Sequence, residues 1–135
     1  MYKANFTAII ECSDPTYSTI LFNTPETSRQ IDPETGGLQV CFQTTPKMST
    51  FSLNMVISRF SYVECTSFGT DVRIYAQPDL YQEGYLAATS AALNLYELSN
   101  FLNSPFPLPA LYFVAVPNFP PGVSDSWGLV SSLFF

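Results

Sequence analysis

The stretch from residue 110 to residue 129 constrains the fold more than any other part of this 135-residue chain. Its opening segment, residues 110–116, is apolar and rich in β-branched and aromatic side chains, which predicts a buried strand. Prolines and a glycine at residues 117–122 then break regular structure, a polar segment follows, and apolar residues resume at Trp127. A buried strand, a rigid loop and a second strand commonly hold backbone against a ligand, although the same pattern also fits a connection with no binding role.

The composition predicts a folded chain and argues against two classes of partner. Hydrophobic residues make up 47% of the sequence and charged residues only 12%. The length suits one domain or pieces of two. The net charge is −6 with only five lysines and arginines, so a nucleic acid or an anionic membrane surface is a poor candidate partner.

The sequence shows no membrane span and no signal peptide. No apolar run approaches the roughly 18–20 residues that cross a bilayer. The amino terminus lacks the long apolar segment of a secretory signal. As written, the chain is expected to be cytoplasmic, and its location is unknown if it is part of a longer protein.

The residues that most often carry catalysis or bind metals are scarce. The chain has no histidine, which excludes a Ser-His-Asp triad, a Cys-His dyad and any histidine-ligated zinc. Its three cysteines, Cys12, Cys41 and Cys65, are widely spaced and form no C-x-x-C pair, so they are expected to be free thiols. We therefore predict no catalytic residue and no metal ligand within this chain.

The first half of the chain predicts antiparallel strands. Residues 3–12 alternate in polarity, with Ala4, Phe6, Ala8, Ile10 and Cys12 on the buried face. Further strands are expected at residues 18–23, 38–42, 51–57 and 60–67, and residues 23–37 are expected to be an exposed loop. In the strand at 51–57, Phe51, Leu53, Met55 and Ile57 are expected to point inward.

The second half adds a strand at residues 72–78 and the principal helix. Asp79 and Gln82 have the spacing of a capping box at the start of this helix. A stripe at helical spacing predicts a core-facing side: Tyr81, Tyr85, Ala88, Ala92 and Tyr96, widened by Leu86, Thr89 and Leu93. Residues 103–109 contain three prolines and lead to Ala110 without helix. The expected fold is mainly β with one principal helix, of the α+β class.

Five motifs, in matching order, resemble the M1 family of zinc aminopeptidases. Residues 114–129 are similar to the family's V-A-x-P-D-F-x-x-G-A-M-E-N-W-G-L. Residues 42–51 and 60–64 resemble F-x-T-T-P-x-M-S-T-Y and F-x-Y-V-E. Residues 72–78 and 105–109 resemble V-R-I-x-A-R-P and P-Y-P-L-P, so the resemblance extends over residues 3–129.

The resemblance implies two partial domains. Residues 1–69 correspond to the later part of the amino-terminal β-saddle domain, and residues 70–135 to the start of the thermolysin-like catalytic domain. The junction is expected near residues 69–71. The correspondence ends before the family's zinc-binding helix.

The resemblance also implies a degenerate substrate-binding segment. In the family, the backbone of the G-A-M-E-N edge strand pairs with the substrate peptide, and its glutamate holds the free α-amino group. The five matching residues here are Gly122, Val123, Ser124, Asp125 and Ser126. The carboxylate of Asp125 is one methylene shorter than that of glutamate, and Ser126 lacks the amide of asparagine. Residual peptide binding and ordinary loop polarity both remain open for these residues.

Three hypotheses for function follow. Peptide hydrolysis in the family needs zinc, held by an H-E-x-x-H helix and a distal glutamate, and this chain has none of these elements. The first hypothesis is a truncated pseudoenzyme without peptidase activity on its own; the second is a segment of an active zinc aminopeptidase whose catalytic helix lies outside this chain. The third is a non-enzymatic module that pairs through exposed sheet edges. The expected partners are peptide N-termini, a second copy of the chain, or a full-length homologue.

Overall fold

A computed structural model describes residues 2–67, 69–120, 122–124 and 126–133. The strands are β1 (Ile9–Cys12), β2 (Thr19–Phe22), β3 (Glu26–Ile31), β4 (Leu38–Phe42), β5 (Met55–Ser58), β6 (Ser61–Ser67), β7 (Thr70–Ala76), β8 (Ala110–Val116), β9 (Val123–Ser124) and β10 (Leu129–Leu133). Short 3-10 helices form at Thr50–Ser52 and Tyr81–Gly84, and the long helix α1 spans Tyr85–Phe101. The mainly β fold with one principal helix is therefore confirmed.

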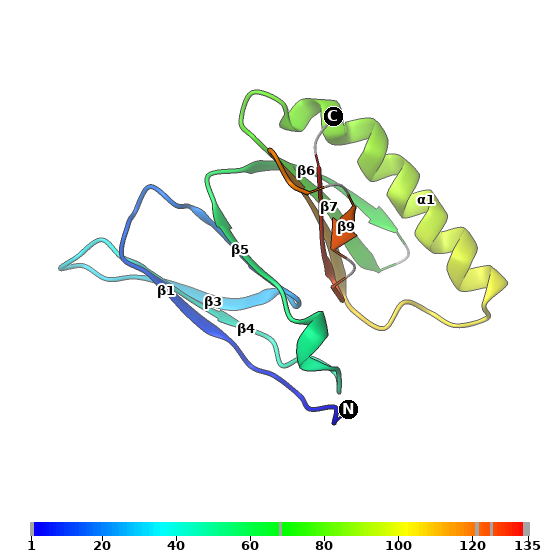
Figure 1. Cartoon of the computed structure of the whole chain (residues 1–135), viewed down its shortest axis with the longest axis horizontal. Coiled ribbons are helices and arrows are strands. Elements are labelled where there is room, and N and C mark those ends of the chain that lie inside the picture. The colour runs from blue at the N-terminus through cyan, green and yellow to red at the C-terminus, as the bar shows by residue number, and fades with distance from the viewer. Residues whose placement is uncertain (1, 68, 121, 125, 134–135) are drawn as a thin grey trace.

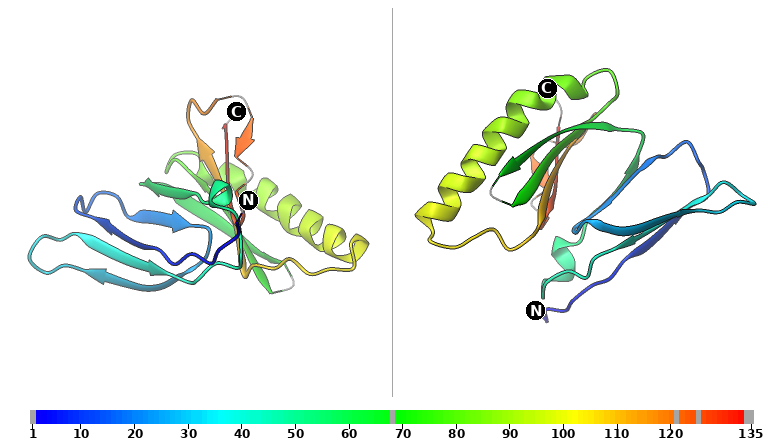
Figure 2. Two further views of the ribbon diagram at one scale, coloured as in Figure 1. Left: turned by 60° about the horizontal axis from the view of Figure 1, so that its bottom comes forward. Right: turned by 180° about the vertical axis from the view of Figure 1, so that it is seen from behind.

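The strands form three sheets arranged as layers (Figure 1). A three-stranded antiparallel sheet has the order β1-β4-β3, and β2 pairs with β5. The third sheet has the order β6-β7-β8-β10-β9 and is mixed, because β8 is parallel to both of its neighbours. The rear view in Figure 2 shows α1 on the outer side of this five-stranded sheet, away from the three-stranded one.

Strand β2 is buried on both faces and joins the layers. Ile20 and Phe22 pack with Val40 in the core of the three-stranded sheet. Leu21 points the other way and packs with Val114 in the core of the five-stranded sheet. Because successive side chains on a strand point to opposite faces, one short apolar run serves both cores.

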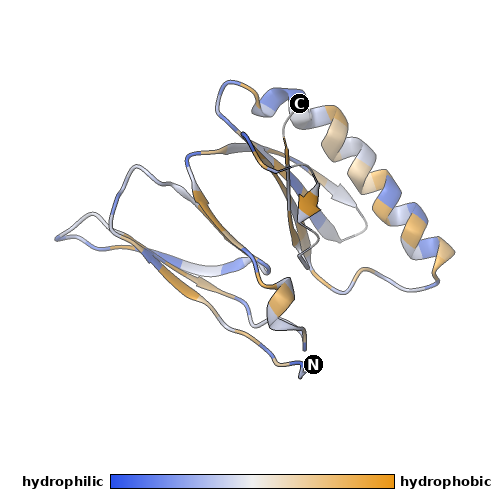
Figure 3. Ribbon diagram, in the orientation of Figure 1, coloured by the Kyte–Doolittle hydropathy of each residue, from blue (hydrophilic) through white to orange (hydrophobic). Residues whose placement is uncertain are grey.

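Helix α1 lies close to the sheet through small residues. Ala88 and Ala92 are buried, and the hydroxyl of Ser67 on β6 donates a 2.7 Å hydrogen bond to the carbonyl oxygen of Ala92. At Gly84, an added Cβ would lie 3.1 Å from Cγ2 of Ile74. The small side chains allow the close approach, and Leu86, Leu93 and Phe101 are exposed. Figure 3 shows that hydrophobic and hydrophilic residues alternate along α1.

The expected helix start and core stripe are partly wrong. Asp79 does not cap the helix: a 3-10 turn precedes α1, and neither helical segment has a side-chain cap. Ala88 and Ala92 are buried as expected, whereas Tyr85, Leu86 and Leu93 are exposed. The contact with the sheet is narrower than the apolar side of the helix, so periodicity overestimated the buried face.

The loop expected at residues 23–37 contains a strand, β3. Every residue of β3 is exposed, and the strand pairs with β4 through its backbone at the edge of the sheet. Without a buried face, its side chains show no alternation that could predict a strand. The remaining turn is closed by the Asp32 amide, which donates to the Gly37 carbonyl oxygen at 2.8 Å.

The faces expected for the strand at 51–57 are reversed except at Leu53, which packs against the core of the three-stranded sheet as expected. Residues 50–52 are a 3-10 turn, and β5 begins only at Met55. Phe51 is 80% exposed and Met55 62%, whereas Ser58 is buried. The reversal has a physical reason: the amide of Asn54 finds acceptors inside the fold, so a polar side chain can occupy the inward face.

The first strand is shorter than residues 3–12. Continuous pairing covers only Ile9–Cys12, with an isolated bridge between Ala4 and Met48. The alternation is confirmed from Phe6 onward, since Phe6, Ala8, Ile10 and Cys12 are half-buried, but Ala4 is exposed.

The expected domain junction lies inside a continuous sheet. Strand β6 pairs with β7 from the Ser61–Ala76 pair to the Ser67–Thr70 pair. The division into residues 1–69 and 70–135 stays a prediction. The two strands that flank this boundary, β6 and β7, are paired in one sheet. In the described part of the chain, no helix is long and apolar enough to cross a membrane.

Candidate functional site

The candidate peptide-binding segment forms the edge of the five-stranded sheet. Val123 and Ser124 make up β9, which pairs antiparallel with β10 through the Ser132–Val123 and Ser131–Ser124 pairs. In the strand order β9 comes last, so among the described residues its other edge has no partner strand. Figure 1 shows β9 at this margin of the sheet. Such an edge presents backbone groups that can accept another strand.

The segment residues have different environments along this edge. Gly122 has a φ of +132°, a conformation that favours glycine, and no heavy atom would lie within 4 Å of an added Cβ. Val123 is 63% exposed. Ser126 is buried, and its Oγ lies 3.2 Å from Oγ of Ser124. Asp125 lies outside the described residues, so its expected contact with a peptide amine stays a prediction.

Strand β10, which holds β9, is anchored by two asparagines that the sequence analysis did not identify. Asn23 follows β2 and donates from Nδ2 to the carbonyl oxygen of Trp127 and, at 2.8 Å, to that of Ser52. Asn54 precedes β5 and donates from Nδ2 to the Leu129 carbonyl oxygen at 3.2 Å. The signal that could have identified Asn23 is a lone amide at the end of the apolar run of residues 20–22.

Gly128, just before β10, allows the backbone to pack closely against Asn23, just after β2. Its φ is +74°, and an added Cβ would collide with the carbonyl oxygen of Asn23 and lie 2.9 Å from Cδ1 of Leu108. The Gly128 carbonyl oxygen also accepts a 2.8 Å hydrogen bond from the Tyr112 amide. Glycine is therefore required at this position by both backbone conformation and space.

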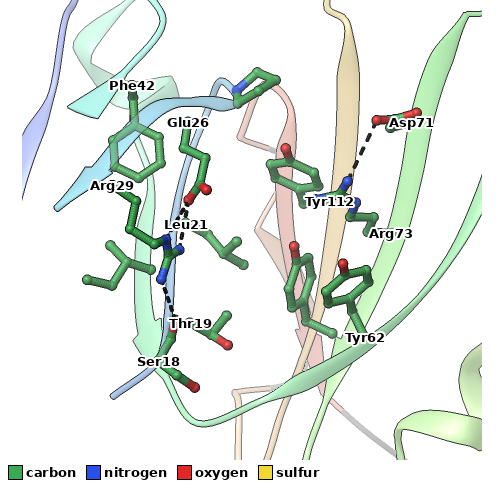
Figure 4. A pocket seen from close by; sticks show the side chains of 13 residues that line it. Ser18, Thr19, Leu21, Glu26, Arg29, Phe42, Tyr62, Asp71, Arg73 and Tyr112 are labelled. Atoms are coloured by element: carbon green, nitrogen blue, oxygen red, sulfur yellow. Dashed lines mark hydrogen bonds and ion pairs between the residues drawn. The ribbon is translucent and has the colours of Figure 1, made fainter. Parts of the chain in front are cut away.

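A separate polar pocket of about 360 Å³ lies between the β2 and β3 segment and the five-stranded sheet (Figure 4). Arg29 pairs with Glu26 at 2.7 Å on one side, and Arg73 pairs with Asp71 at 3.7 Å on the other. Its lining residues are Ser18, Thr19, Ile20, Leu21, Pro25, Glu26, Arg29, Phe42, Tyr62, Asp71, Arg73, Tyr75 and Tyr112. Within the five-stranded sheet, the pocket is lined by β6, β7 and β8, so it lies away from the β9 edge.

Two tyrosines of this pocket, Tyr75 and Tyr112, are buried. Burial raises the pKa of Tyr112 to about 12. Burial also raises the pKa of Tyr75 above its ordinary value, although a hydrogen bond with Arg73 opposes the shift. Both phenols are therefore protonated at neutral pH, and each of the two arginines faces a carboxylate.

The side chains present do not fit the family's zinc site. The chain has no histidine, and within the described ranges no three Cys, Asp or Glu side chains come together as a metal site. Cys12, Cys41 and Cys65 are free thiols, as expected. The carboxylate of Asp32 is taken up locally by the Glu34 amide at 2.9 Å and the Thr35 hydroxyl at 2.6 Å.

Comparison with known proteins finds many aminopeptidases, whereas no family model matches the chain. Endoplasmic reticulum aminopeptidase 2 of Bos taurus is 35% identical over 134 residues, 97% of this chain and 14% of that protein. Aminopeptidase M1-A of Oryza sativa subsp. japonica is 33% identical over 133 residues, 96% of this chain and 14% of that protein. Aminopeptidase N of Oryctolagus cuniculus is 32% identical over 120 residues, 85% of this chain and 12% of that protein.

The similarity extends over nearly the whole chain but over only a small part of each relative. The chain spans 12–14% of the length of these three proteins. The names of the relatives include an endoplasmic reticulum form and a mitochondrial one, so the cytoplasmic location stays a prediction.

Proposed function

Since this chain is an M1 aminopeptidase-like segment, homologous to aminopeptidases over nearly its whole length, we propose that its β9 edge binds the amino-terminal end of an extended peptide. The observation that carries the proposal is the position of Val123 and Ser124 at a margin of the sheet that no other described strand pairs with. A peptide would add there as a further strand, with affinity from main-chain hydrogen bonds.

The charge of the chain supports an amine as the recognised group. The net charge is −6, so the field of the molecule favours the positively charged N-terminus of a peptide over its carboxylate end. By resemblance, Asp125 is the residue that meets the amine. Its side chain is shorter than that of glutamate, so we expect weak binding.

We propose that this polypeptide alone does not hydrolyse the peptide it binds. The chain has no histidine, the donor side chains among its described residues do not fit a zinc site, and hydrolysis in the family depends on zinc. The alternative is that the same edge serves an active aminopeptidase whose H-E-x-x-H helix lies on further sequence. Both proposals include the binding step. The gene sequence separates them, because codons for H-E-x-x-H after residue 135 would support the alternative.

A second candidate function is pairing with another protein chain. It is favoured by large exposed apolar side chains on the helix and on two sheet edges: Leu86, Leu93, Phe101, Ile31 and Met55. Apolar side chains left in water favour association, and unpaired strand edges offer a template for it. The partner would be a second copy of the chain or a full-length homologue.

Binding is tested with tetra-alanine that has a free N-terminus and with its N-acetylated form. NMR titration of the isotope-labelled chain should show shifts at residues 122–126 with the free peptide and weaker ones with the acetylated peptide. Asp125→Asn should reduce the difference between the two peptides. Asp79→Asn, which removes the same charge from an exposed residue elsewhere, should not. Equal binding of both peptides to the unmodified chain would contradict amine recognition.

Hydrolysis is tested with alanine anilide and metal analysis of the same preparation. We expect no turnover and no stoichiometric zinc. Turnover by the chain with bound zinc would refute the proposal that it is inactive alone.

A further inference from the structure

Three groups on β10 and its approach accept hydrogen bonds from the side chains of Asn23 and Asn54. Asn23 donates to the Trp127 carbonyl oxygen, and Asn54 donates to the Leu129 carbonyl oxygen at 3.2 Å and to Oγ of Ser131 at 3.3 Å. The acceptors alternate along the chain at residues 127, 129 and 131. The two asparagines therefore bind β10 at successive points, from the residues that precede it to the residue that pairs with β9.

The two asparagines are also joined to each other. The backbone amide of Asn54 donates to Oδ1 of Asn23 at 2.9 Å, so the orientation of the Asn23 amide is fixed from both ends. Asn23 is 1% exposed. A buried amide that lost these partners would leave polar atoms without water, so the arrangement resists sliding of β10 against the β2 and β5 layer.

We call the pair Asn23 and Asn54, with their hydrogen bonds to β10 and its approach, the clamp. Ser131 links the clamp to the candidate site. It accepts the hydrogen bond of Asn54 through its side chain, and its backbone is paired with Ser124 of β9. A displacement of Ser131 therefore moves the strand whose free edge would meet the peptide. Between Trp127 and Leu129, Gly128 lies against the backbone of Asn23, so the chain has no room for a different approach to β10.

We propose that Asn23 and Asn54 are positioning residues for the β9 edge: they set the position of β10, and through it the backbone that would pair with a peptide. The inference rests on the proposed peptide binding for its functional meaning. The clamp itself is a property of the sheet and can be measured without any peptide. It makes the β2 and β5 layer, from the first half of the chain, part of the site on β9.

Asn54→Asp is the test variant, because it keeps the shape of the side chain but replaces the donor by a carboxylate facing the Leu129 carbonyl. At neutral pH, amide hydrogen exchange in β9 and β10 should become about tenfold faster or more, with little change in β1 and β4. As the pH falls and the new carboxyl group gains a proton, it becomes a donor again and the ratio of variant to unmodified exchange rates should return toward one. Asn94→Asp on the exposed side of α1 is the matched control and should show neither effect.

Ser131→Ala is the second variant, in case Asn54→Asp does not fold. It removes one of the two acceptors of Asn54 and should speed exchange at residues 123–124 by a smaller factor. If exchange in β9 and β10 is unchanged in the folded variants, or if its acceleration in Asn54→Asp is independent of pH, the clamp is refuted.

The peptide titration separates this inference from the proposed function. If the unmodified chain does not bind tetra-alanine, the proposed function fails, whatever the exchange rates show. If it binds, Asn54→Asp should bind more weakly than the unmodified chain at neutral pH. At acidic pH the affinities of the two chains, measured at the same pH, should become similar. Unchanged binding with faster exchange would overturn the positioning role and leave the proposed function in place.

Discussion

The guanidinium carbon of Arg73 lies 4.9 Å from the ring centre of Tyr62, on the neighbouring strand of the five-stranded sheet. A second ring, that of Tyr112, lies 5.9 Å from the same carbon, and the carboxylate of Glu64 lies 3.2 Å from Nε. Arg73 thus ties β6, β7 and β8 together across their faces. A cation held over aromatic rings and beside carboxylates is stabilised by both, and the more so where water is partly excluded.

Arg73→Met should therefore lower the free energy of unfolding by about 1–2 kcal/mol, with the apolar stem retained. Urea unfolding followed by tyrosine fluorescence measures the change. Arg59→Met is the matched control: its guanidinium carbon is 5.1 Å from the ring centre of Tyr17, but Arg59 is exposed, so a loss of at most about 0.5–1 kcal/mol is expected. Equal losses for the two variants would contradict the argument from burial.

Alkaline pH should destabilise the fold through Tyr112. Burial raises the pKa of this phenol to about 12 in the folded chain, from an ordinary value of 10.0. Because the unfolded chain loses the proton first, the contribution of Tyr112 is fully present below pH 10 and is lost as the pH rises toward 12. Urea unfolding between these values should show falling stability, and Tyr112→Phe should reduce the slope. Tyr2→Phe, at an exposed position, should leave the slope unchanged.

Gly128→Ala should be much more harmful than Gly36→Ala, although the two glycines have nearly the same conformation. Their φ angles are +74° and +70°. Both substitutions cost about 1 kcal/mol of backbone strain, but nothing lies within 4 Å of a Cβ at Gly36, whereas a Cβ at Gly128 collides with the Asn23 backbone. We expect a further loss of about 2 kcal/mol or more at Gly128. The difference between their urea midpoints is the measurement, and similar midpoints would refute the close contact.

The sequence predicted the parts of this fold in which a buried face and a regular period coincide. Strands β1 and β4 alternate between more buried and more exposed positions within the segments that the pattern predicted, and β8 coincides with the apolar run of residues 110–116. Strand β3 has no buried face, so its existence depends on pairing with β4 and could not be seen in its side chains. The reversed faces of β5 could not be predicted from local pattern either. Asn54, which precedes this strand, points inward because its amide has a hydrogen-bond partner distant in sequence.

The residues of the candidate site were predicted from the resemblance, whereas the two asparagines that hold its neighbouring strand were not. The motif located residues 122–126, and the sheet order then put β9 at an edge. Asn23 and Asn54 lie 104 and 75 residues from Trp127 and Leu129, their respective acceptors. No local pattern encodes hydrogen bonds over such separations, since they depend on how the layers pack.

Self-association of the chain should depend on the exposed face of α1. Leu86 and Leu93 are seven residues apart, so they share one side of the helix, and they are 76% and 61% exposed. Burying such side chains contributes roughly 1.5–3 kcal/mol each, which is large beside a domain stability of about 5–15 kcal/mol. We expect the purified chain to sediment as oligomers, and the double substitution Leu86→Glu and Leu93→Glu to shift it toward monomer. Ser90→Glu, which adds charge to an exposed position between them while both leucines remain, should have a smaller effect. A chain that sediments as a monomer before any substitution would contradict association through this face.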